Sequence, residues 1–136
     1  MPTPQDLDLF LRVFFAAILG ALVGLERERR QRPAGLRTFM LVSTGSALFT
    51  IISAYGFAGS DPARVAAQIV TGIGFLGAGM ILRQQKQVVG LTTAAGMWAV
   101  AAIGMACGVG LYWIAFLATF LVALILLAMR VIEKGE

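Results

Sequence analysis

The chain has 136 residues, of which 59% are hydrophobic and 13% charged, with 11 Lys and Arg against 7 Asp and Glu. Soluble domains are roughly 45–50% apolar and about 25% charged, and a soluble fold of this length buries only about two-thirds of its chain surface. The composition therefore excludes a soluble enzyme, a disordered tail and a disulfide scaffold, and it indicates an integral membrane protein.

Counts of single residue types exclude further classes. The sequence has no histidine, which removes histidine catalysis and histidine metal ligands. Its one cysteine, Cys107, cannot form an internal disulfide. The basic excess is concentrated in one segment instead of being spread over a face, so we expect no nucleic-acid partner. Because the sequence offers no nucleophile–base pair and no cofactor motif, we expect neither enzyme activity nor a bound cofactor.

Five apolar runs follow one another, each near the ~20 residues that cross a bilayer as a helix. The first, 7–25, follows acidic residues and is too long for a signal peptide. The second covers 36–57, and the third is expected to open at Pro62, with Asp61 as its N-cap, and to run to 82. A polar loop at 83–87 precedes the fourth, 91–107, and a short turn precedes the fifth, 111–132. The sequence thus predicts an all-α, polytopic membrane protein, with one domain over residues 1–136 and no soluble domain after it.

The positions of Lys and Arg predict the orientation in the membrane. With five spans, the first loop, the third loop and the C-terminal tail share one side, and they hold most of the basic residues: Arg27, Arg29, Arg30, Arg32, Arg37, Arg83, Lys86, Arg130 and Lys134. The opposite side carries acids at the N-terminus and an uncharged fourth loop. We therefore expect an external N-terminus and a cytoplasmic C-terminus.

Polar residues form a stripe on the third span. Arg64, Gln68 and Thr71 are spaced i, i+4, i+7 and share one helix face. Since a glutamine in contact with lipid leaves its amide unsatisfied, we expect this stripe to face the interior of the bundle. Two interpretations stay open: hydrogen bonds that hold helices together, or a pathway or ligand site.

The second span carries a similar stripe of small hydroxyl residues: Ser43, Ser46, Thr50 and Ser53. Their hydroxyls can bond to carbonyls of their own helix, so burial alone accounts for them. With Gln68 and Thr71 opposite, the stripe would equally line a narrow polar seam. No span has a carboxylate at its centre, which counts against a proton pump or a deep cation site.

Glycines are frequent within the spans. Gly72, Gly74 and Gly77 formally match the dinucleotide-binding pattern G-x-G-x-x-G, but no strand precedes them, so we reject a nucleotide site. Small residues allow helices to approach closely in lipid. We therefore expect packing roles for Gly20, Gly24, Gly72, Gly74, Gly77, Gly79, Gly104 and Gly108.

Charged residues at the two boundaries suggest pairs. Arg64 at a helix start is disfavoured by the helix dipole and should have an acidic partner, either Asp61 or an acid from another segment. Glu26 and Arg37 have opposite mismatches across the first loop, so we expect them to pair. Each pair is either a structural clamp or a functional site. Asp61 and Glu26 are also the only plausible first contacts for Mg²⁺, which prefers oxygen ligands.

The sequence resembles the MgtC/SapB family of bacterial inner-membrane proteins. The resemblance lies in residues 24–28 (GLERE), 32–38 (RPAGLRT), 61–79 (DPARVAAQIVTGIGFLGAG) and 90–95 (GLTTAA), the last of which adds Thr92 to the candidate polar residues. It implies five helices with an external N-terminus and a location in the inner membrane. Many relatives add a cytoplasmic ACT-like domain, and the ending of this chain favours the shorter form.

The resemblance implies a role in magnesium homeostasis and in survival at low magnesium, including inside host cells. It favours a regulator that binds another membrane protein, such as the F-type ATP synthase. The alternative is a transporter or channel for Mg²⁺ or another small solute, formed by an oligomer. We expect a homo-oligomer, most simply a two-fold dimer.

Overall fold

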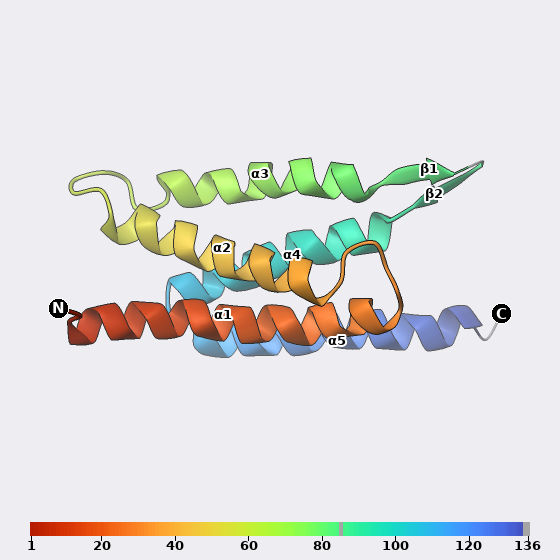
Figure 1. Ribbon diagram of the computed structural model, residues 1–136, viewed down its shortest axis with the longest axis horizontal. Helices are drawn as coiled ribbons and strands as arrows, with labels where there is room; N and C mark the ends of the chain where they lie inside the picture. The colour runs from red at the N-terminus through yellow and green to blue at the C-terminus, as the bar shows by residue number, and fades with distance from the viewer. Residues whose placement is uncertain (85, 135–136) are drawn as a thin grey trace.

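The computed structural model describes residues 1–84 and 86–134, and it is an all-α bundle with one short β-hairpin (Figure 1). The helices are α1 (Pro4–Arg29), α2 (Leu36–Tyr55), α3 (Arg64–Met80), α4 (Leu91–Gly108) and α5 (Tyr112–Lys134). Between α3 and α4 lie β1 (Leu82–Gln84) and β2 (Gln87–Val89). The all-α class predicted from composition and hydrophobic runs is confirmed.

Four helices, α1, α2, α4 and α5, are long and apolar enough to cross a membrane. The fifth, α3, has 17 residues, which corresponds to about 25 Å of helix, against about 30 Å for the hydrocarbon core. The structure therefore supports a multi-pass membrane protein, and the number of crossings stays a prediction.

The connection around α3 differs from the predicted one. The helix begins at Arg64, not at Pro62, and its N-cap is Ala63. Asp61 belongs to the preceding turn, where its Oδ1 accepts a hydrogen bond from the Ala63 N–H at 2.9 Å. The expected N-cap at Asp61 is therefore wrong, because the Asp61–Arg64 segment closes a turn before the helix starts.

The predicted polar loop at 83–87 is a hairpin among the described residues. Its strands pair antiparallel, with Leu82 opposite Val89. The hairpin ends at Gly90, which has a φ of 96° and where a Cβ would overlap the Met80 carbonyl. A glycine is needed at this position, since only glycine adopts a positive φ without cost, and it directs the chain into α4.

The first helix starts three residues before the predicted span because its first turn is capped. The Thr3 hydroxyl accepts from the Asp6 N–H at 3.2 Å, and the Thr3 N–H donates to Asp6 Oδ2 at 2.7 Å. This is a capping box with Pro4 in the first helical turn. The hydrogen bonds from Thr3 lower the pKa of Asp6 from its ordinary value.

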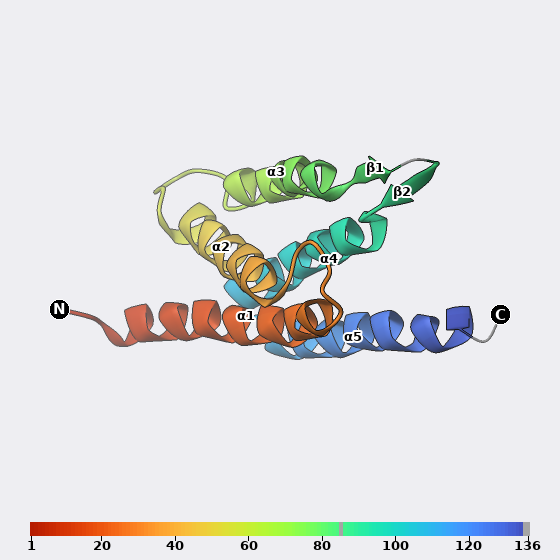
Figure 2. The same ribbon diagram turned by 45° about the vertical axis from the view of Figure 1, so that its right-hand side comes forward.

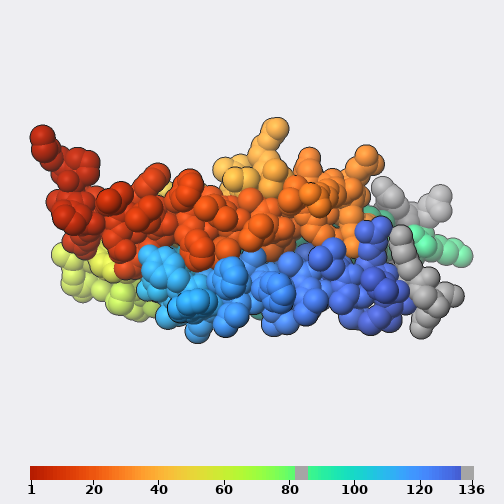
Figure 3. All heavy atoms as spheres, turned by 90° about the horizontal axis from the view of Figure 1, so that it is seen from below, coloured from red at the N-terminus to blue at the C-terminus, as the bar shows by residue number. Residues whose placement is uncertain are grey.

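The helices run back and forth along the long axis of the molecule (Figures 1 and 2). One end holds the N-terminus, the α2–α3 connection and the α4–α5 turn; the other holds the α1–α2 loop, the hairpin and the end of α5. We call the second end the basic end, because the arginines of the α1–α2 loop lie there. Seen from below, α1 and α5 lie side by side along most of the molecule (Figure 3).

Glycines bring α1, α2 and α4 into close contact. A Cβ added at Gly20 of α1 would lie 2.8 Å from the Cβ of Ser43 on α2. From α4, a Cβ at Gly108 would lie 2.8 Å from the Ala47 carbonyl oxygen, and one at Gly104 would overlap the Ser43 carbonyl. The core therefore consists of helices at backbone distance, with large side chains such as Leu19, Phe39 and Met97 buried between them.

Candidate functional site

The hydroxyl stripe of α2 lies inside the chain, where three of its four hydroxyls form hydrogen bonds and Ser43 Oγ has no partner among the described residues. Ser43, Ser46, Thr50 and Ser53 are all buried. Ser46 Oγ donates to the Ala101 carbonyl of α4 at 2.5 Å, and Thr50 Oγ1 donates to the Ser46 carbonyl at 2.8 Å. Ser46 faces α4, whereas Ser53, at the end of the stripe, reaches the start of α3. Gln68 and Thr71 are exposed, so the polar seam between the two spans, one of the two open interpretations, is not formed within the single chain.

Ser53 has a structural role that sequence reasoning missed. Its Oγ accepts hydrogen bonds from the Val65 N–H at 3.0 Å and the Ala66 N–H at 3.2 Å. The first N–H groups of a helix lack intrahelical partners, so Ser53 of α2 caps α3 from outside. Its place at the end of the stripe was visible in the sequence, but the N–H groups it would meet were not.

The polar stripe of α3 lies on the outside of the single chain. Arg64, Gln68 and Thr71 are exposed, so the expectation that they face the interior is wrong for one chain. The buried residues of α3 are Ala66, Ile73 and Gly77, which contact α2 and α4. At about 100° per residue, Gln68 lies nearly opposite Ala66. Only one of these two faces can pack against the bundle, and it is the apolar face with the buried residues that does so.

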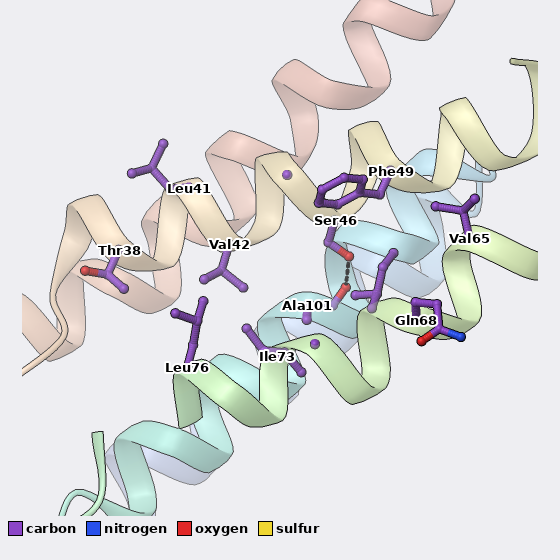
Figure 4. A pocket seen from close by; sticks show the side chains of 13 residues that line it. Thr38, Leu41, Val42, Ser46, Phe49, Val65, Gln68, Ile73, Leu76 and Ala101 are labelled. Atoms are coloured by element: carbon purple, nitrogen blue, oxygen red, sulfur yellow. Dashed lines mark hydrogen bonds between the residues drawn. The ribbon is translucent and has the colours of Figure 1, made fainter. Parts of the chain in front are cut away.

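A groove of about 600 Å³ separates α2 from α3 (Figure 4). Its walls are largely apolar, with Leu41, Val42 and Phe49 from α2 and Leu76 from α3. Gln68 lies at its edge, and Figure 4 shows its amide pointing away from the Ser46 hydroxyl. The groove is therefore a largely apolar cleft, with Thr38, Ser46 and Gln68 as its polar lining residues.

Glycines on α3 have free space around them. A Cβ added at Gly72, Gly74 or Gly79 would meet nothing within 4 Å, and one at Gly77 would lie 3.7 Å from the Ala94 Cβ. Within one chain, the first three are therefore not packing positions. Phe75, between them, is 82% exposed. We call the surface formed by Gln68, Thr71, Gly72, Gly74, Phe75 and Gly79 the open face of α3.

At the basic end, Glu26 pairs with arginines of its own helix. Its carboxylate lies 2.5 Å from Arg27 Nε and 2.6 Å from Arg30 Nε. The expected pair with Arg37 is wrong, because these nearer cations take both oxygens while Arg37 is exposed at the start of α2. The acid that contacts the start of α2 is Glu28, whose Oε2 accepts a hydrogen bond from the Leu36 N–H at 3.0 Å.

At the opposite end, Asp61 and Arg64 form no ion pair among the described residues. The arginine that forms an ion pair at this end is Arg12, which sequence reasoning did not single out. Its Nη2 lies 2.9 Å from Asp8, and its Nη1 donates to the Gly108 carbonyl at 3.1 Å. A cation at a helix C-terminus is favourable, so Arg12 ties α1 to the end of α4. The i, i+4 spacing of Asp8 and Arg12 was the available signal.

The two proposed magnesium contacts are far apart. Glu26 lies at the basic end and Asp61 in the connection at the other end (Figure 1). Among residues 1–84 and 86–134, no group of three or more His, Cys, Asp or Glu could hold a metal ion. The structure therefore does not bring these candidates into one site.

Thr92 lies at the start of α4 and is exposed. Together with buried Thr93 it borders a hollow of about 580 Å³, which also receives the side chains of Arg27, Arg30, Arg32 and Arg130. Four arginines and the first residues of α4 thus line the same hollow. The cluster of arginines was visible in the sequence, but its position beside residues 90–95 was not.

The chain was compared with known proteins. It is 47% identical over 127 residues to a protein of Escherichia coli K12 named "Putative magnesium transporter YhiD", covering 88% of this chain and 59% of that protein. It is 52% identical over 112 residues to "Protein MgtC" of Salmonella typhimurium, covering 82% of this chain and 48% of that protein. The chain thus spans about half the length of these curated relatives. No solved structure matches it. Residues 13–135 match the MgtC family, and with these identities the chain belongs to the MgtC family.

Proposed function

We propose that this chain is a multi-pass inner-membrane protein of magnesium homeostasis that regulates another membrane protein by binding it through the open face of α3. The link to magnesium is supported by the name of the Escherichia coli relative, "Putative magnesium transporter YhiD". The regulatory role is supported by the polar and small residues that α3 leaves exposed at the surface of the single chain.

One observation carries the binding role: polar and small residues share the outward side of α3. Gln68 and Thr71 are exposed there, beside glycines with nothing within 4 Å. In hydrocarbon, an amide without a partner costs several kcal/mol. A helix seated on this face would supply hydrogen-bond partners for Gln68 and could approach the glycines at backbone distance.

For the membrane we propose five crossings, with the N-terminus outside and the basic end in the cytoplasm. The alternation of the helices along one axis supports this (Figure 1). Positively charged loops stay in the cytoplasm. In this arrangement α3 crosses as a short helix, and the hairpin extends the chain beyond it at the basic end.

The proposed partner is a membrane-spanning helix of another protein, and the resemblance to MgtC/SapB proteins makes the F-type ATP synthase a candidate. A second copy of this chain is the competing occupant. That arrangement favours the second candidate function, a transporter or channel, because Gln68 and Thr71 of two copies would then line a shared polar seam.

Matched substitutions test the role of the open face. Gly72→Leu fills the space that a partner helix needs, at a position where an added Cβ meets nothing within 4 Å in the chain itself. Ala128→Leu adds the same kind of bulk to the exposed surface of α5. In a bacterium lacking its own family member, we expect Gly72→Leu to abolish rescue of growth at low magnesium, and Ala128→Leu to retain it at equal protein level. Equal rescue by both variants would contradict the proposal.

Transport is tested separately in vesicles made with the purified protein. The regulatory proposal expects no saturable magnesium flux above empty vesicles. Saturable flux that disappears in Gln68→Leu would favour the oligomeric transporter instead. Asp61→Asn and Glu26→Gln serve as further probes, since these carboxylates are the candidate first contacts for the ion.

A further inference from the structure

We propose that the basic end of the bundle holds a binding site for the phosphate headgroup of an anionic phospholipid. The site is the hollow of about 580 Å³ between the end of α1, the start of α4 and the C-terminal half of α5. It is separate from the open face of α3 and does not depend on the proposed function.

The charge of this hollow is strongly positive. Four arginines line it, Arg27, Arg30, Arg32 and Arg130, and no acid is among its described lining residues. Glu26, beside it, neutralises part of the charge of Arg27 and Arg30 through their Nε atoms. Arg32 and Arg130 take part in none of the ion pairs formed by the described side chains. An anion is the ligand that this arrangement favours.

Buried donors point to the same conclusion. Arg27 and Thr93 are each 2% exposed, and both border the hollow. Arg27 carries five N–H donors, of which the Nε–H is held by Glu26. An anion in the hollow would accept charge-assisted hydrogen bonds from donors of this kind.

The backbone adds further donors. Helix α4 starts at Leu91, and no side chain caps its start. Its first backbone hydrogen bond is donated by the Ala94 N–H to the Gly90 carbonyl. The N–H groups before Ala94 therefore lack intrahelical partners. Phosphate groups bind well at such helix starts, where free N–H groups and the helix dipole both favour negative charge.

The apolar walls favour a lipid over a soluble phosphate. Leu91, Ile125 and Met129 line the hollow and are each about half exposed. A second hollow of about 670 Å³ lies between α1 and α5 and shares Arg30, Arg32 and Arg130 with the first; Glu26, Arg29 and apolar residues such as Leu22 and Leu127 also line it. Figure 3 shows these helices side by side. Acyl chains could occupy these surfaces while the headgroup meets the arginines, as in other basic pockets between membrane helices.

The test measures lipid binding to the purified full chain. Protein stripped of lipid in detergent is given equimolar phosphatidylglycerol and phosphatidylcholine, and native mass spectrometry counts the bound molecules of each. We expect a clear preference for phosphatidylglycerol. Each arginine near an anionic group contributes about fivefold, so Arg32→Gln combined with Arg130→Gln should weaken phosphatidylglycerol binding about 30-fold.

Two further variants keep the test specific. Arg37→Gln removes the same charge at the same end but outside the hollow, and it should leave the preference unchanged. Thr93→Val keeps the shape of the side chain and should weaken binding about tenfold, because one hydrogen bond to a charged group is lost. Circular dichroism checks that each variant is folded.

The other outcomes overturn the proposal. No preference for phosphatidylglycerol, or an equal loss in Arg37→Gln, would show that only general charge acts. Competition by inorganic phosphate at a concentration equal to that of the lipid would assign the hollow to a soluble anion. None of these results depends on growth at low magnesium, so this site and the open face of α3 can fail independently.

Discussion

Two sets of glycines in this chain have opposite surroundings: one set is packed against another helix, and the other faces open space. Gly20, Gly24, Gly104 and Gly108 lie against the backbone of α2, where an added Cβ would meet atoms at 2.9 Å or less. At Gly72, Gly74 and Gly79 of α3, an added Cβ would meet nothing within 4 Å. Both sets consist of glycines within apolar helices, so the residue type alone does not tell a contact inside the chain from a surface left for a partner.

The difference lies in what surrounds each glycine. Around the first set, the hydroxyls of α2 are buried, and Ser46 donates a hydrogen bond to the Ala101 carbonyl of α4. Beside the second set, Gln68 and Thr71 remain exposed. A membrane helix that keeps both its polar and its small residues on the outside is incomplete by itself.

Replacing a glycine that packs against α2 with a large residue should have the largest effect on the yield of folded protein. Gly104→Leu forces a side chain into the Ser43 carbonyl and the Ser46 Cβ. Since overpacking costs typically about 1–3 kcal/mol even where only side chains must move, we expect more than that here and loss of folded protein. Gly72→Leu should accumulate normally. The yield of monodisperse protein from size-exclusion chromatography in detergent measures the effect of both substitutions. Equal yields of the two variants would contradict the distinction between the two sets of glycines.

Removing Glu26 should be the next largest perturbation. Glu26→Ala leaves Arg27, which is 2% exposed, without its ion-pair partner. Breaking a buried pair in this way costs about 3–5 kcal/mol. Glu28→Ala, in which an exposed residue loses only one hydrogen bond to Leu36, is the matched control and should cost about 1 kcal/mol. Unfolding in detergent by added denaturant compares the two, and a smaller loss in Glu26→Ala would show that the pair is not needed.

Loss of the cap on α3 should have a smaller, local effect. Ser53→Ala removes the acceptor of the Val65 and Ala66 N–H groups and should cost about 1 kcal/mol, as other N-caps do. Hydrogen exchange should speed up at the start of α3 and not in α4. Ser60→Ala, in the exposed connection before α3, is the control. Unchanged exchange at Val65 would mean that α3 does not depend on α2 for its start.

The smallest effect is expected at the start of α1. The hydrogen bonds from Thr3 depress the pKa of Asp6 below its ordinary value of 3.8. The carboxylate therefore stabilises the helix start above that value, and this contribution is lost as the pH falls through the folded pKa. An NMR titration should place the Asp6 midpoint below 3.8, and Thr3→Ala should raise it. A midpoint unaffected by Thr3→Ala would contradict the capping box.

Sequence reasoning was reliable where hydrophobic length decides the structure and unreliable where two surfaces compete. Runs of apolar residues predicted all five helices, with ends displaced by a few residues. The stripe at Arg64, Gln68 and Thr71 was correctly recognised as one face, but Ala66 and Ile73 on the opposite face pack into the bundle instead. Glu26 was expected to reach across a loop to Arg37, whereas arginines of the same helix are nearer. Contacts such as Ser53 with α3 depend on tertiary placement, which spacing does not encode.

The most direct measurement is photo-crosslinking from the open face of α3 in living cells at low magnesium. A photoreactive phenylalanine analogue replaces Phe75, which is 82% exposed, and in the control it replaces Leu117, which is 60% exposed on α5. The account predicts a crosslink from position 75 to a membrane-spanning segment of a different protein, lost when Gly72→Leu is added, and none from position 117. Crosslinks to lipid alone from both positions, or from position 75 only to a second copy of this chain, would contradict it.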